Sequence, residues 1–83
     1  MVNLTLKDEV KTRLLIAETG SSLRGFSKNV GVSHAYVSQI LSGKRKPSPT
    51  IASKIARGLD KKIEEIFLIK VVENNNRKSE EVN

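Results

Sequence analysis

Residues 23–42 contain two short helical segments separated by Gly31, and this arrangement constrains the chain more than any other feature. Ser22 is placed to cap the first segment, and Ser33 is placed to cap the second. A turn of three or four residues that contains a glycine lets two helices meet at about 90 to 120°. The second segment, residues 34–41, can then be held out from the body of the protein with one side free to contact a partner.

A further helix is predicted before this pair. Thr5 followed by Asp8 three residues later approximates a capping box, so we expect the first helix to start after Thr5 and to stop at Gly20. Apolar residues at helical spacing give this helix an inward side, which we expect to consist of Val10, Leu14 and Ala17.

A basic loop and two more helices are predicted after the pair. Pro47 and Pro49 restrict the residues before them to extended conformations, so residues 44–49 cannot form regular helix and should form a basic loop. Ser48 can cap a fourth helix that has Pro49 at its favoured first position. A short fifth helix follows at about residues 61–67. The apolar sides of these two helices are predicted to be Ile51, Ile55, Ala56 and Leu59, and Ile63, Ile66 and Phe67.

The segments that join and end this array are less regular. Gly58 indicates that the fourth helix ends there in a turn. Residues 66–72 are rich in β-branched side chains, so they either extend the fifth helix or form a short strand. An alternating pattern at the other end is also typical of a strand, and it consists of Val2, Leu4 and Leu6. A small pairing between the termini, within one chain or between two, is left open.

The sequence thus predicts an all-α fold with a helix-turn-helix at about residues 23–42 and this optional terminal pairing. Residues 74–83 are polar and have too little apolar surface to order themselves. We therefore expect one domain over residues 1–73 and a disordered tail over residues 74–83.

Positive charge is concentrated in the middle of the chain. Residues 23–62 hold nine basic residues against Asp60 alone, which gives +8, whereas residues 1–22 are neutral and residues 63–83 sum to −2. A polyanion is the natural partner of such a segment, although lysines also serve to keep small domains in solution. The chain has no cysteine, no apolar run of about 18 residues and no signal-peptide pattern, so we expect a cytoplasmic protein without disulfides or a membrane partner.

The outward side of residues 34–41 has the chemistry needed to read base edges. Gln39 can bond adenine N6 and N7 together, a serine can bond either kind of group, and an Ala35 or Tyr36 surface can touch a thymine methyl. Val37, Ile40 and Leu41 are left to anchor the helix inward. The predicted base-contacting residues are Ser33, His34, Ala35, Tyr36, Ser38 and Gln39.

Cations and capping serines flank this helix. Side chains directly after it can neutralise phosphates, and free N–H groups at helix starts can bind phosphate oxygens. The residues predicted to contact phosphate on these grounds are Ser22, Lys28, Lys44, Arg45, Lys46, Ser48 and Thr50.

Residues 23–67 resemble the lambda-repressor-like, Cro/Xre-type helix-turn-helix family. The match rests on Leu23, Phe26-Ser27, Val30-Gly31-Val32-Ser33, Val37-Ser38-Gln39-Ile40, the SGKRKPSP loop, Ile55-Ala56-Arg57-Gly58-Leu59 and residues 63–67. The resemblance implies a compact five-helix domain, a recognition helix at residues 33–41, and a homodimer on a two-fold-related operator. It places His34, Ala35 and Gln39 at base contacts, and Ser42, Lys44 and Lys46 at backbone contacts. It also points to a phage or mobile-element regulator.

Two positions depart from the family pattern. Ser27 stands where relatives usually have Ala, and it is small enough for the two helices to close. Leu23 stands where many relatives have a Gln that braces the phosphate, which leaves that anchoring to Arg24 or Lys28.

The expected function is therefore sequence-specific binding of double-stranded DNA by a transcriptional regulator, most simply a repressor that recognises an inverted repeat. The chain offers no positioned acid, base or nucleophile, and its single histidine, His34, has no ligand set beside it, so we expect no enzyme, metal, cofactor or small-molecule substrate. RNA binding lacks the interleaved aromatic residues that stack bases. The alternative is an antitoxin-type or other protein-binding module that uses residues 66–72 to bind a partner protein.

Overall fold

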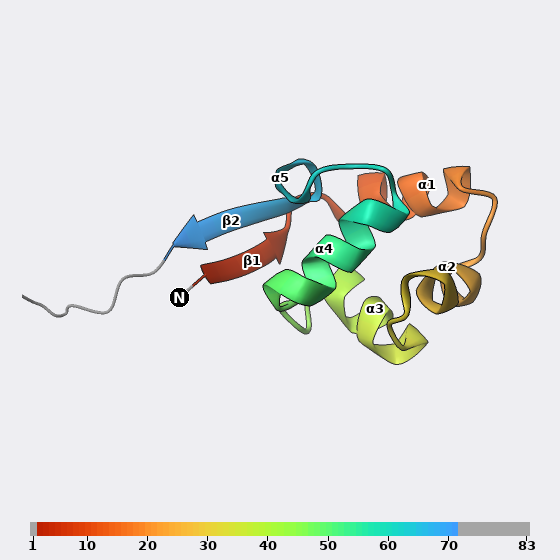
Figure 1. Cartoon of the computed structure of the whole chain (residues 1–83), viewed down its shortest axis with the longest axis horizontal. Coiled ribbons are helices and arrows are strands. Elements are labelled where there is room, and N and C mark those ends of the chain that lie inside the picture. The colour runs from red at the N-terminus through yellow and green to blue at the C-terminus, as the bar shows by residue number, and fades with distance from the viewer. Residues whose placement is uncertain (1, 72–83) are drawn as a thin grey trace, which may run out of the picture.

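The computed structural model describes residues 2–71, which form five helices enclosed in sequence by two strands (Figure 1). The elements in order are β1 (Val2–Leu6), α1 (Glu9–Glu18), α2 (Leu23–Val30), α3 (His34–Leu41), α4 (Pro49–Gly58), α5 (Ile63–Ile66) and β2 (Phe67–Val71). The helical fold class is confirmed, with one small strand pair added at the termini. The predicted tail at residues 74–83 and the domain end at residue 73 lie outside the described residues.

Three of the helix starts are confirmed, and each is fixed by a serine. The hydroxyl of Ser22 accepts a hydrogen bond from the Gly25 N–H at 3.1 Å. Ser33 accepts from Tyr36 at 3.2 Å and Ser48 accepts from Ile51 at 3.3 Å in the same way. Each bond satisfies one amide that a helix start would otherwise leave unpaired, so these short helices begin where the sequence predicts.

The predicted start of α1 is wrong. Asp8, and not Thr5, caps the helix: its Oδ1 accepts from the Lys11 N–H at 3.0 Å. Thr5 instead lies in β1, paired with Leu68 of β2. The reason is that the backbone of residues 2–6 is used in a ladder with a strand far away in sequence, which a local capping pattern cannot anticipate.

The predicted inward side of α1 is also wrong. Val10 and Leu14 are 78% and 57% exposed, and Ala17 is exposed as well. The buried residues are Thr12 and Ile16. Thr12 can be buried because its hydroxyl donates to the Asp8 carbonyl oxygen at 2.7 Å, which satisfies its polar group within the helix.

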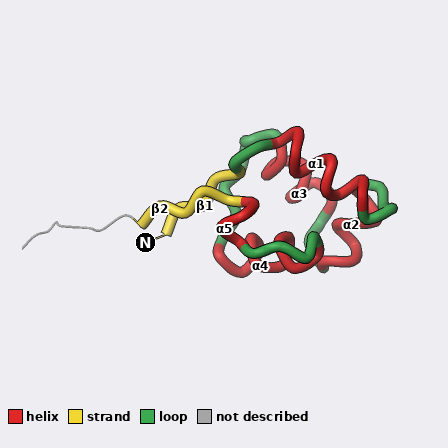
Figure 2. The backbone as a smooth tube through the Cα atoms, turned by 90° about the horizontal axis from the view of Figure 1, so that it is seen from above, coloured by secondary structure: helices red, strands yellow, loops and turns green. Residues whose placement is uncertain are grey.

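The fifth helix is shorter than predicted at both ends, because Lys62 is its extended N-cap residue and Phe67 already belongs to β2. β2 pairs antiparallel with β1 of the same chain, in a register that runs from Val2 opposite Val71 to Leu6 opposite Phe67. The sequence left open whether residues 66–72 extend the fifth helix or form a strand, and whether the termini pair within one chain or between two. In the structure, residues 67–71 form a strand that pairs within the same chain. This two-stranded ribbon projects from the helical body in both Figure 1 and Figure 2.

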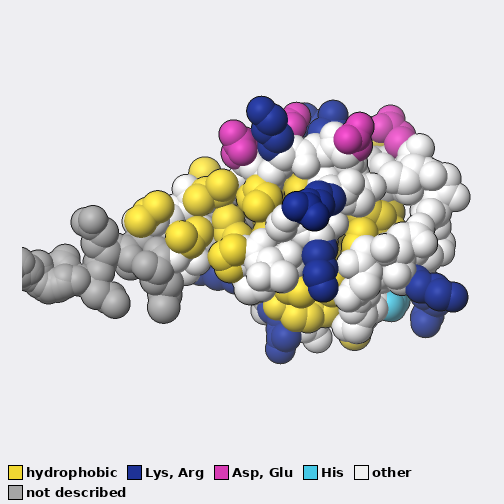
Figure 3. Space-filling view, in the orientation of Figure 1, with side chains coloured by type: hydrophobic (Ala, Val, Ile, Leu, Met, Phe, Trp, Pro, Cys, Tyr) yellow, Lys and Arg dark blue, Asp and Glu magenta, His cyan; other side chains and the backbone are white. Residues whose placement is uncertain are grey.

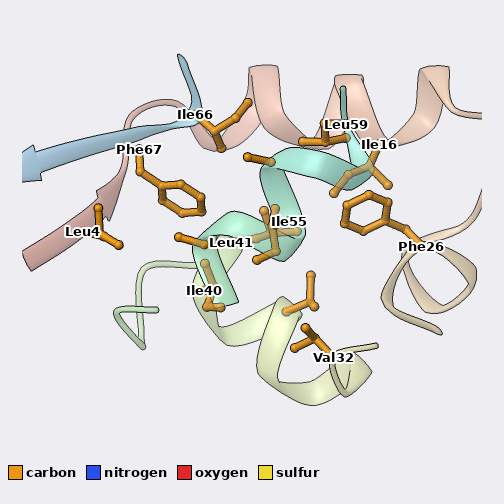
Figure 4. Close-up of a cluster of buried hydrophobic side chains, with 13 residues drawn as sticks. Leu4, Ile16, Phe26, Val32, Ile40, Leu41, Ile55, Leu59, Ile66 and Phe67 are labelled. Atoms are coloured by element: carbon orange, nitrogen blue, oxygen red, sulfur yellow. The ribbon is translucent and has the colours of Figure 1, made fainter. Parts of the chain in front are cut away.

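The core lies between α1, α2, α3 and α4 and is closed at one end by the base of the ribbon (Figure 4). Phe67 and Leu4 enter it from the strands, whereas Phe26 and Ile16 fill its other end. Leu4 and Phe67 are 2% and 0% exposed, so the ribbon is anchored by its own side chains. Burial of these side chains supplies the main favourable term for folding in a domain of this size.

Candidate nucleic-acid interface

The helix α3 presents one apolar and one polar side, as the sequence predicts. Val37, Ile40 and Leu41 are 0%, 1% and 2% exposed and fix the helix to the core. The six residues predicted to contact bases differ in their exposure, and Tyr36 packs against the core. Ser33, Ala35 and Gln39 are exposed, and His34, Tyr36 and Ser38 are half-buried.

The turn between α2 and α3 is held by hydrogen bonds of its own backbone. Gly31 adopts a left-handed conformation (φ 76°), and its N–H donates to the Lys28 carbonyl oxygen. The Val32 N–H donates to the carbonyl oxygen of Ser27 at 3.1 Å. A positive φ is open to glycine without steric cost, so Gly31 sets the angle at which α3 leaves α2.

Ser27, one of the two departures from the family pattern, is accommodated without loss. It is 1% exposed, and its hydroxyl donates to the Leu23 carbonyl oxygen at 2.8 Å. Its small side chain therefore fits between the helices without an unsatisfied polar group. Leu23 is half-buried and packs against the core, whereas Arg24 and Lys28 are exposed on α2, one helical turn apart.

The loop after α3 is attached to the end of that helix. The carbonyl oxygen of Gln39 accepts from the N–H groups of Lys44 and Arg45, at 2.9 and 3.2 Å. Pro47 is buried, so the loop is also fixed at its other end. The three cations of the loop are thus presented by a fixed backbone next to the helix that carries Gln39.

Tyr36 and Arg45 form a contact that the sequence did not predict. The guanidinium carbon of Arg45 lies 4.8 Å from the centre of the Tyr36 ring, within the range of a cation–π interaction. Tyr36 also packs against the core. No sequence signal identifies this pair, because the residues are nine positions apart and meet only through the path of the loop.

Charge is segregated around this helix. All nine residues proposed for phosphate contact are exposed, namely Ser22, Arg24, Lys28, Ser42, Lys44, Arg45, Lys46, Ser48 and Thr50. Within residues 2–71 the only ion pair is Glu9–Arg13 on α1, at 2.9 Å. In the view of Figure 3 the acidic side chains gather along the edge formed by α1 and α5, opposite the edge formed by α3. Within the described residues, the cations of α2 and of the loop after α3 therefore form no ion pair with an acidic side chain.

Two features are absent from the part of the chain that the structure describes. In residues 2–71, no group of three or more His, Cys, Asp or Glu side chains could hold a metal ion. No helix of the same residues combines the length and the apolar character needed to cross a membrane.

Two helices joined by a glycine turn, with the second projecting between exposed cations, define a helix-turn-helix DNA-binding domain. A family model described as "Helix-turn-helix" matches residues 13–66, more than half of the chain. The chain belongs to this Cro/C1/Xre-type helix-turn-helix family, which confirms the resemblance noted from the sequence, and it is a DNA-binding regulator. No curated protein and no solved structure matches it.

Proposed function

We propose that the protein is a sequence-specific repressor that binds an inverted-repeat operator as a homodimer, with α3 of each copy in the major groove. The observation that carries the proposal is the division of α3, whose inward side is locked in the core while its outward side is polar and uncharged. An α-helix fits the major groove, where the pattern of donors and acceptors differs for each base pair.

We assign the contacts with bases to the outward side of α3. Gln39 can bond the N6 and N7 groups of adenine together, and Ala35 can contact a thymine methyl group. His34, at the first position of the helix, can donate to a guanine acceptor or to a phosphate. Ser33 caps the helix through its hydroxyl oxygen, and its hydroxyl hydrogen can still donate to an acceptor on DNA.

Phosphate contacts are assigned to the cations and helix starts around α3. Lys44, Arg45 and Lys46 follow the helix on a backbone that is bonded to its last turn. At the start of α4, Pro49 has no N–H and the Ile51 N–H is already bonded to Ser48, which leaves the Thr50 N–H to bind a phosphate oxygen. These contacts fix the register of the protein on the duplex without reading sequence.

A dimer is proposed because one α3 reads too few base pairs to specify a site alone. Two copies related by a two-fold axis read two half-sites of opposite direction, with centres about 34 Å apart, which is one turn of B-DNA. An operator that overlaps a promoter would then be closed to polymerase when the dimer is bound, which is the basis for proposing a repressor.

The competing interpretation, capture of a partner protein by residues 66–72, is not favoured. Ile66 and Phe67 of that segment are 3% and 0% exposed, so they belong to the core of this chain. Only the part of β2 beyond Phe67 is accessible.

Selection of bound sequences from random duplex DNA tests the proposal. We expect an inverted repeat whose half-sites are about one helical turn apart, and a drop in reporter expression when that repeat is placed over a promoter. When the same selection is made with Gln39→Ala, the base preference at one position of each half-site should weaken or disappear. Failure of the wild-type protein to enrich any sequence would overturn sequence-specific binding, and reporter activation would overturn the repressor role.

A further inference from the structure

The ribbon of β1 and β2 has one entirely apolar face. Residues directly opposite each other in an antiparallel pair point to the same side of the sheet, and every second residue shares that side. The register therefore collects six apolar side chains on one face, namely Val2, Leu4, Leu6, Phe67, Ile69 and Val71. The other face carries Asn3, Thr5, Leu68 and Lys70.

Only the base of the apolar face is covered. Leu4 and Phe67 are 2% and 0% exposed in the core, but Val2 and Ile69 are 42% and 43% exposed, and Val71 is 68% exposed. These last three form what we call the ribbon tip, and apolar side chains cover the ribbon in Figure 3 where it leaves the helical body. An isolated two-stranded ribbon is at best marginally stable in water, and a contiguous exposed apolar face commonly marks an interaction site.

The apolar and uncharged character of the ribbon tip indicates which partner can bind there. The segment that follows β2, residues 72–83, has Val72 and Val82 as its only apolar residues, so it is poorly suited to cover the tip. The tip carries no charge, and it offers nothing to recognise a charged partner. A second copy of the same chain presents the same uncharged apolar face, and a two-fold contact requires a surface that complements itself in this way.

The position of the ribbon in the molecule is also consistent with a second copy of the chain binding at its tip. A groove lined by Thr5, Leu6, Glu9, Leu41, Ser42 and Gly43 shows that the base of β1 lies beside the end of α3 and the start of the basic loop. A two-fold axis at the ribbon tip would therefore place the two basic loops towards the centre of a dimer. The two α3 helices would lie farther out, as two half-sites on one duplex require.

We propose that a second copy of the chain docks on the ribbon tip, through Val2, Ile69 and Val71, and that this contact forms the dimer. The proposal rests on the proposed function for its two half-sites, and it adds the surface by which the two copies meet. Each free strand edge also offers unpaired backbone N–H and C=O groups that a strand of the second copy can bond.

The test compares Ile69→Lys with Leu68→Lys, two neighbouring and similarly exposed positions of β2 that lie on opposite faces of the ribbon. Sedimentation velocity over a concentration series, without DNA and with the selected duplex, measures the dimer. A two-fold contact would bring the two introduced ammonium groups together, so we expect dimer affinity to fall about tenfold or more for Ile69→Lys and to change little for Leu68→Lys. Val71→Lys, at the most exposed tip position, should repeat the loss with less risk to folding.

Binding to a duplex cut to one half-site separates this proposal from the proposed function. The ribbon variants should bind one half-site like the wild type and lose cooperative binding to two. Equal effects of Ile69→Lys and Leu68→Lys would overturn the ribbon interface, as would a wild type that stays monomeric and fills two half-sites independently. A dimer lost in Leu14→Lys but kept in Ile69→Lys would overturn it in favour of the exposed side of α1. Failure of the wild type to bind any duplex would instead overturn the proposed function.

Discussion

The Arg45 guanidinium lies over the Tyr36 ring, 4.8 Å from its centre, and this contact joins a cation of the basic loop to α3. Tyr36 is itself fixed, because its ring packs against the core. Arg45 therefore loses less side-chain freedom on binding a phosphate than a free surface arginine would, which lowers the entropic cost of the contact.

Tyr36→Leu, which keeps apolar bulk but removes the ring, should weaken binding to any duplex by about two- to fivefold, because an exposed cation–π contact contributes roughly 0.5 to 1 kcal/mol. Tyr36→Phe keeps the ring and should stay close to the wild type. Fluorescence anisotropy on Tyr36→Leu, on Arg45→Ala and on the two combined gives a double-mutant cycle. Strictly additive losses would show that Tyr36 does not act through Arg45.

Gln39→Ala should cost roughly 1 to 3 kcal/mol on the selected operator while leaving affinity for unrelated duplex nearly unchanged, because a bidentate base contact contributes only at the correct base. The fold should be unaffected, since the Gln39 side chain is exposed and its structural bonds use the backbone carbonyl. Competition binding against specific and unrelated duplexes measures the difference. Parallel losses on both duplexes would remove Gln39 from base reading.

Lys46→Ala should weaken binding to all duplexes alike, because a phosphate contact does not depend on sequence. Each phosphate neutralised releases counterions, so the slope of log K against log salt should become shallower by about 0.9. Lys61→Ala is the matched control, because Lys61 lies beside Asp60 and Glu65, in a surface pocket remote from the loop. A salt slope that does not separate the two variants would exclude Lys46 from the phosphate contacts.

The parts of the fold that the sequence predicted correctly depend on local chemistry. Ser22, Ser33 and Ser48 each bond an amide three residues ahead, so the cap and its helix start are contained in one short segment. The division of α3 was predictable for a similar reason, because helical spacing alone places Val37, Ile40 and Leu41 together.

The parts that failed depend on contacts between distant segments. α1 has two candidate apolar sides, and the choice of Ile16 over Val10 and Leu14 is made by the core it packs against. The local spacing of Thr5 and Asp8 predicts a cap, but Thr5 pairs in a strand with Leu68, which lies nearly the whole chain away in sequence. In the candidate site, the exposure of Ala35 and Gln39 could be predicted, whereas the partial burial of Tyr36 and the attachment of the loop to the Gln39 carbonyl could not.

Gly58 illustrates the same limit and gives a stability prediction. The sequence suggested only that it ends a helix, but a Cβ at this position would lie 2.4 Å from Val30 Cγ1 and 2.9 Å from Phe26 Cε1, so glycine is what lets α4 approach α2. Gly58→Ala should therefore destabilise the domain by about 1 to 3 kcal/mol, since the clash is with core side chains that have little room to move. For a domain of this size, each kcal/mol lowers the melting temperature by roughly 4 to 8 °C.

Gly25→Ala is the control for this substitution. A Cβ at Gly25 would meet Ser22 Oγ at 3.4 Å, a contact that a small shift relieves, and Gly25 lies in a helix, where alanine is favoured over glycine by roughly 0.5 to 1 kcal/mol. Thermal unfolding followed by circular dichroism should show a lower melting temperature for Gly58→Ala and an equal or higher one for Gly25→Ala.

The turn between α2 and α3 depends on the packing of α2 against α4, so Gly58→Ala should also weaken DNA binding near its melting temperature. Binding at low temperature should stay close to that of the wild type. An unchanged melting temperature for Gly58→Ala would mean that α2 and α4 are not packed as closely as this contact requires.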